Sequence, residues 1–104
     1  MSGPSLAVSH PVIRDVLRRA AIEVPGVLRV GRGGPAWRRA LGGRAVAIRV
    51  REGAVEARVV VVARPGQPLP AVAAAVRDAT AAAIERLLGL RIGTVSVLID
   101  GVGA

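Results

Sequence analysis

Two stretches of the chain repeat their apolar residues at the spacing of an α-helix. The first covers residues 11–24, carries charged residues on its other side and ends at Pro25-Gly26. The second starts near Pro70 and ends at Gly89, a residue type that is common directly after a helix. We therefore predict two amphipathic helices, each with one buried stripe.

A hairpin is expected between residues 44–51 and 54–63, with its turn at Glu52-Gly53. This register places apolar side chains opposite one another on one face and Arg49 opposite Glu56 on the other. A slip by one residue would break both matches, so the pattern predicts the register as well as the strands. The apolar pairs are Val50 with Val55, Ile48 with Ala57, and Val46 with Val59.

The last strand is expected over residues 92–99, with Val95, Val97 and Ile99 on one face. The order helix, strand, strand, helix, strand predicts an α+β fold. We expect a two-layer α/β sandwich, in which a three-stranded mixed sheet carries both helices on one face. The place of the last strand stays open, because it fits beside the first strand, antiparallel, or beside the second by a right-handed crossover.

One domain is expected over residues 9–102, preceded at residues 1–8 by a flexible lead or a short strand at Leu6-Ala7-Val8. Residues 27–43 are expected to form a long Arg/Gly-rich connection. No stretch reaches the roughly 18 apolar residues of a membrane span. The first residues also lack the basic and apolar regions of a signal peptide, so we expect a cytoplasmic protein.

The sheet face that the helices leave open is the first candidate surface. Single exposed valines are ordinary, whereas an apolar cluster on one face is typical of a binding surface. The candidates for partner binding are three apolar residues and two arginines on this face, Val60, Val62, Leu98, Arg49 and Arg58.

The second candidate surface is basic. The net charge is +8, and every cationic side chain other than the single histidine is arginine. A genome rich in G and C accounts for arginine in place of lysine, but not for the excess of basic over acidic residues. The candidates for polyanion binding, to an anionic membrane surface or to nucleic acid, are Arg29, Arg32, Arg38, Arg39 and Arg44. Nucleic acid is the less favoured target, because the strands carry no aromatic side chains on which bases stack.

Trp37 is the sole aromatic residue of the chain. We favour its interpretation as a hydrophobic plug over a core that otherwise consists of small side chains. The alternative is an anchor for a partner or for a bilayer interface, flanked by Arg38 and Arg39.

The chain has few residues of the types that form catalytic sites. There is one histidine, His10, at the expected start of a helix, and there is no cysteine. The seven acidic residues are scattered, and none pairs with another at an acid/base or metal-ligand spacing. We therefore expect no enzyme, no catalytic residues, no metal, no cofactor and no small-molecule substrate.

Several packing and turn patterns together resemble those of the alkaline shock protein family, whose members are bacterial envelope stress response proteins. They are Val8-Ser9-His10-Pro11-Val12-Ile13 leading to residues 20–27, residues 55–62, residues 68–73, and residues 89–92 continuing through Val95-Ser96-Val97 to Asp100-Gly101-Val102. The resemblance implies a small cytoplasmic protein without enzymatic activity, which self-associates or is held at the inner face of the membrane by a separate anchor protein.

This chain departs from the family pattern in being strongly basic, and in having Ala63-Arg64-Pro65-Gly66 where the family often has an aromatic and acidic stretch. The leading hypothesis is a scaffold of the envelope stress response that binds protein partners. The alternative is a basic module that binds polyanions.

Overall fold

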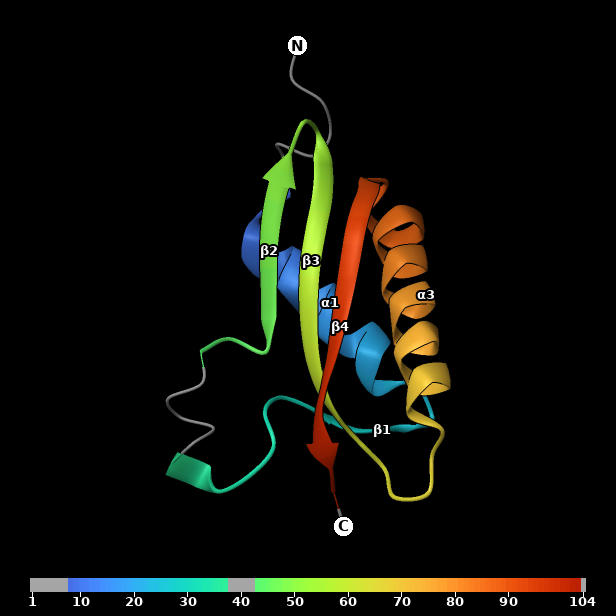
Figure 1. Cartoon of the computed structure of the whole chain (residues 1–104). Helices are drawn as coiled ribbons and strands as arrows, with labels where there is room; N and C mark the ends of the chain where they lie inside the picture. Colours follow the sequence, from blue (N-terminus) through green and yellow to red (C-terminus); the bar gives the residue numbers. More distant parts are fainter. Residues whose placement is uncertain (1–7, 38–42, 104) are drawn as a thin grey trace.

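The computed structural model describes residues 8–37 and 43–103 of the 104-residue chain. The described residues form two long helices and one mixed sheet (Figure 1). The elements are, in chain order, α1 (His10–Ile22), β1 (Val27–Val30), β2 (Val46–Arg51), β3 (Ala54–Ala63), α3 (Leu69–Leu88) and β4 (Arg91–Val102).

Strand β3 is the centre of the sheet. β4 runs parallel to it along one edge, and β2 and β1 are antiparallel to it. Because β4 occupies one edge over the whole of β3, β2 and β1 share the other edge. The two meet at Val60, whose N–H donates to the Ala45 carbonyl and whose carbonyl accepts from the Gly31 N–H.

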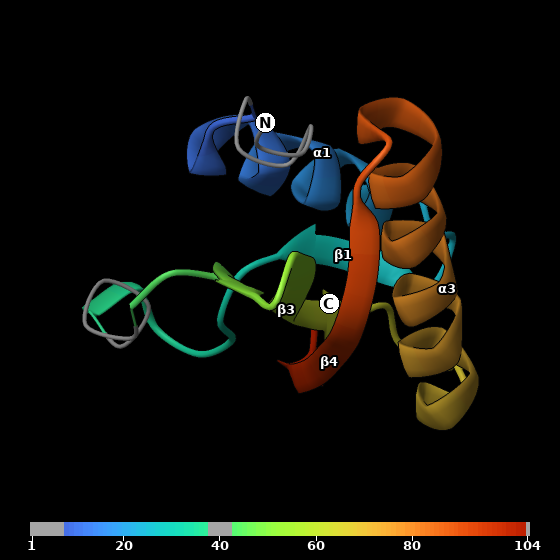
Figure 2. The ribbon, with the colours of Figure 1, turned by 90° about the horizontal axis from the view of Figure 1, so that it is seen from above.

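Both helices lie against the same face of the sheet. α1 buries Ile13, Leu17 and Ala21, which repeat every four residues, and α3 does the same with a stripe that begins at Val72. The apolar residues of these stripes form one core with Val55, Ala57, Val59 and Val61 of β3. Figure 2 shows α1 and α3 side by side, with β4 along α3.

Thr80 is a fully buried polar residue of α3. Its hydroxyl donates to the Val76 carbonyl at 2.7 Å and is therefore satisfied within the helix. The helix ends at Gly89, whose left-handed conformation (φ 65°) lets the following N–H of Leu90 reach back to Ile84. The expected end of this helix is confirmed.

The hairpin register is also confirmed, since Val50 lies opposite Val55 and Arg49 opposite Glu56. Both turn residues, Glu52 and Gly53, have positive φ angles, as a tight hairpin turn requires. The last strand, β4, pairs in parallel with β3, the second strand of the hairpin. Of the two placements left open, the one beside the second strand is therefore confirmed, and the antiparallel one beside β2 is excluded.

The expected number of strands is wrong. The described sheet has four strands, and the order of the elements is helix, strand, strand, strand, helix, strand. The extra strand is β1, which lies inside the stretch 27–43 that we expected to be a connection. Its four residues are too few for a visible alternation, and it is held by pairing with Val61 to Ala63, far along the chain. The strand option at Leu6-Ala7-Val8 lies largely outside the described residues.

Candidate interaction surfaces

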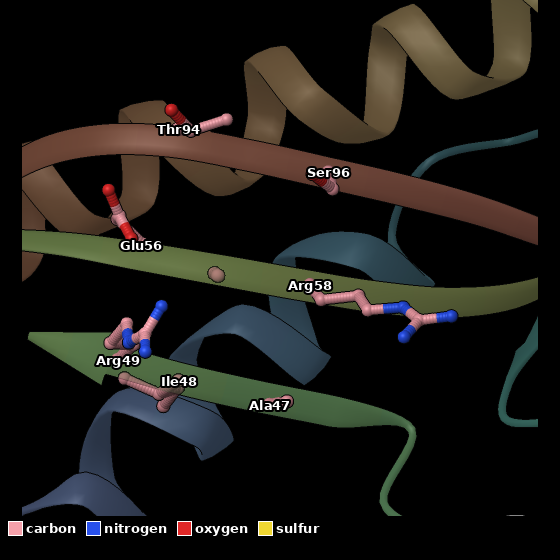
Figure 3. Close-up of a pocket in the computed structure, with 8 residues that line it drawn as sticks. Ala47, Ile48, Arg49, Glu56, Arg58, Thr94 and Ser96 are labelled. Atoms are coloured by element: carbon pink, nitrogen blue, oxygen red, sulfur yellow. The ribbon is translucent and has the colours of Figure 1, made fainter.

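A shallow groove crosses the sheet face opposite the helices (Figure 3). It has a volume of about 530 Å³ and is open to solvent. Three strands line it, and we call it the open groove. Its lining residues are Ala47, Ile48, Arg49, Glu56, Ala57, Arg58, Thr94 and Ser96.

The open groove combines charged and hydroxyl side chains with small apolar ones, and its net charge is positive. Arg49 and Arg58 project from β2 and β3, Glu56 lies on β3 opposite Arg49, and Thr94 and Ser96 add hydroxyl groups from β4 (Figure 3). The backbone of β3 is paired on both edges here, so the face offers side chains and not hydrogen-bonding backbone. Such a surface suits a partner with carboxylates and hydrogen-bonding groups.

Two of the five candidates for partner binding do not reach this surface. Val60 and Val62 are only 1% and 2% exposed, so their expected exposure is wrong. After β1, the chain crosses from Gly31, bonded to β3, to Gly33, whose N–H donates to the Asp100 side chain at 3.0 Å. This segment therefore passes over the end of the face that carries the two valines.

The C-terminal segment closes the same end. A Cβ added to Gly33 would meet Val62 and the Asp100 carbonyl, and one added to Gly103 would meet Val62 and Leu28. Leu98 is 37% exposed and remains at the border of the covered end. The other two candidates, Arg49 and Arg58, are exposed in the open groove, as expected.

A second hollow, of about 540 Å³, lies where β1 ends and β2 begins, beside α1. We call it the arginine pocket, because Arg18, Arg29, Arg32 and Arg44 all line it. Three of these four were expected to form a basic surface. Arg38 and Arg39 were expected there too, but they lie outside the described residues.

Backbone contacts hold two of these arginines in place. Arg29 Nη2 donates to the Arg32 carbonyl at 3.1 Å, and Arg18 Nη1 lies 3.4 Å from the Val30 carbonyl. The remaining lining residues are small or apolar, namely Val30, Gly31, Ala36, Gly43 and Ala45. No acidic side chain is therefore among the described residues that line the pocket.

Trp37 does not plug the core. Its side chain is 67% exposed, so the plug that we favoured is wrong, and the anchor is the interpretation that agrees with its position. It directly follows Ala36, which lines the arginine pocket. The core closes without it because isoleucine, leucine, valine and alanine side chains of the helices pack on the valines of β3.

Sequence reasoning missed Arg18, which is separated from the other three arginines by the end of α1. No local pattern brings it to them, since the pairing of β1 with β3 decides where the chain returns past α1. A signal for the burial of Val60 and Val62 was present. Residues 59–63 are continuously apolar, which is typical of a strand covered on both faces.

The described residues show neither a metal centre nor a membrane span. They contain no group of three or more His, Cys, Asp or Glu side chains that could hold a metal ion. Of the helices in residues 8–37 and 43–103, none has both the length and the apolar character to cross a bilayer.

Together, a two-helix face, an open sheet face and an arginine pocket define a small α+β domain. The chain belongs to the alkaline shock protein 23 family, described as having a cell envelope-related function, whose model matches residues 3–104. The suspected family is thereby confirmed. Comparison with curated protein sequences gives no match.

Solved structures of MamM CTD variants share the fold. A nickel form has a TM-score of 0.56 and 19% identity, and it covers 88% of this chain and 96% of its own. A copper form has a TM-score of 0.58 and 18% identity, over 89% of this chain and 98% of its own. A third variant has a TM-score of 0.58 at 20% identity. At these identities the likeness concerns the fold alone.

Proposed function

We propose that this protein is a non-enzymatic interaction module of the cell-envelope stress response, which binds a protein partner through the open groove. The observation that supports this role is the open sheet face. It presents side chains from three strands, and none of the described residues covers it. The protein would act in the cytoplasm, at the inner face of the membrane, as its family membership favours.

The charge of the open groove favours a particular kind of partner. Arg49 and Arg58 are countered within it by Glu56 alone, so an acidic partner segment is complementary to it. Two copies that met through this same face would place arginines against arginines. We therefore propose a different protein, of the membrane-anchor kind that the family resemblance implies, rather than a second copy of this chain.

Photo-crosslinking in the native cells tests the proposal directly. A photoreactive residue at Ser96, inside the groove, should give one discrete adduct with a second protein, which mass spectrometry identifies. The same residue at Arg77, exposed on α3, is the matched control and should give no such adduct. Adding Arg49→Glu and Arg58→Glu should remove the adduct at position 96, because the two charge reversals repel an acidic partner.

Three outcomes would contradict the proposal. One is an absence of any adduct at position 96 above the level at position 77. The second is an adduct that survives both charge reversals. The third is an adduct of twice the mass of the protein, which would show self-association through the groove instead.

A further inference from the structure

The arginine pocket has the composition of an anion-binding site. It shares no lining residue with the open groove, so it is a separate surface. Its four arginines come from α1, from β1 and from both ends of the segment between β1 and β2. The folded chain therefore holds together like charges that would otherwise repel one another. A bound anion removes that repulsion, and a guanidinium group matches a phosphate with two parallel hydrogen bonds.

Acidic side chains near the pocket are fewer than the four arginines that line it. Asp15 and Arg14 line a smaller neighbouring hollow that shares Arg18 and Arg44 with the pocket, but the Asp15 carboxylate accepts from Arg19 Nε at 2.9 Å. The Asp100 carboxylate, on β4, accepts from the Gly33 N–H. The positive charge that converges on the pocket thus exceeds the negative charge beside it.

We propose that the arginine pocket binds the phosphate of an anionic phospholipid at a membrane surface, while Trp37 inserts into the interfacial region of the same membrane. The exposure of Trp37 favours a phosphate in a membrane over a soluble phosphate ion. A large apolar side chain that is two-thirds exposed beside a cationic pocket has no use for a free phosphate ion, whereas tryptophan is enriched at the membrane–water interface. Nucleic acid is disfavoured because a single aromatic residue offers no series of stacking platforms.

The chain contains a built-in probe for the test, since Trp37 is its only aromatic residue and its fluorescence comes from this position alone. Vesicles of phosphatidylglycerol and phosphatidylcholine should bind the protein and shift its emission to shorter wavelength. Vesicles of phosphatidylcholine alone should do neither. Binding should weaken as salt is raised, because exposed charges are screened.

The double variant Arg18→Gln/Arg44→Gln tests the pocket itself. Each arginine near an anionic surface contributes to binding, and the loss of two should weaken vesicle binding about thirtyfold. The matched control is Arg64→Gln/Arg77→Gln, which removes the same charge from exposed positions outside the pocket and should change binding by less than about threefold. All four side chains are exposed, and circular dichroism checks that both variants stay folded.

Trp37→Ala keeps every arginine and should weaken binding to the vesicles without altering the fold. Several results would overturn the proposal. They are no binding to phosphatidylglycerol vesicles, an equal loss in both double variants, glycerol phosphate binding as tightly as vesicles, or duplex DNA binding more tightly than vesicles. A failure of this proposal leaves the photo-crosslink at Ser96 unaffected, so the two surfaces are judged separately.

Discussion

The two halves of β3 have opposite surroundings, although they are one continuous strand. In the first half, Glu56 and Arg58 line the open groove, and only the other face of the strand is covered by helix. In the second half, Val60 and Val62 are buried on the face that continues from Glu56 and Arg58. The groove therefore ends where the segment after β1 crosses the sheet.

The two halves of β3 also differ in which strand pairs with the edge opposite β4. The first half is paired by β2, its neighbour in the chain, through a tight turn. The second half is paired by β1, which precedes it by more than 30 residues in sequence, and is covered as well by the chain around Gly33 and Gly103. A local hairpin thus builds the exposed half, and distant segments build the covered half.

The sharpest test introduces the same residue into both halves. Val62→Gln should lower the free energy of unfolding by about 3–5 kcal/mol, because it buries an amide and removes a packed valine. Arg58→Gln should change it by less than about 0.5 kcal/mol, since this side chain is exposed. Urea denaturation measures both, and similar midpoints for the two variants would contradict the difference between the halves.

Two glycines give a test of intermediate size. Gly33→Ala should cost about 1–3 kcal/mol, because the new Cβ meets the backbone carbonyl of Asp100, which cannot give way. Gly93→Ala in the open half should change the stability by less than about 1 kcal/mol. There the new Cβ meets Glu56 Cγ at 3.3 Å, on a flexible side chain. Thermal unfolding compares the two, and an equal loss in melting temperature would argue against close coverage at Gly33.

The smallest effect concerns the pair across the hairpin. Arg49→Glu places a like charge opposite Glu56 and should lower the free energy of unfolding by about 0.2–1 kcal/mol. The exchange Arg49→Glu/Glu56→Arg should restore most of that loss. A double-mutant cycle measures the coupling, and a coupling of zero would show that the register places the two charges too far apart to interact.

The local features of the fold were predictable. Helix periodicity identified both helices, and the alternation of residues 46–51 against 54–59 identified the hairpin with its register. For the candidate sites, Arg49 and Arg58 were placed correctly on the open face, and Arg29, Arg32 and Arg44 were correctly grouped. These predictions succeeded because each depends on residues close in sequence, where side-chain spacing decides which face is buried.

What the sequence determined by itself is the set of elements with strong periodicity, the pairing of the hairpin and the excess of arginine. Only the tertiary structure decided that β1 is a strand, which segments cover Val60 and Val62, that Trp37 points to solvent and that Arg18 joins the arginine pocket. The physical reason is common to all four. Each depends on where one short segment, residues 27–37, packs against β3 and β4, and contacts between distant segments follow from the closure of the whole chain rather than from a local pattern.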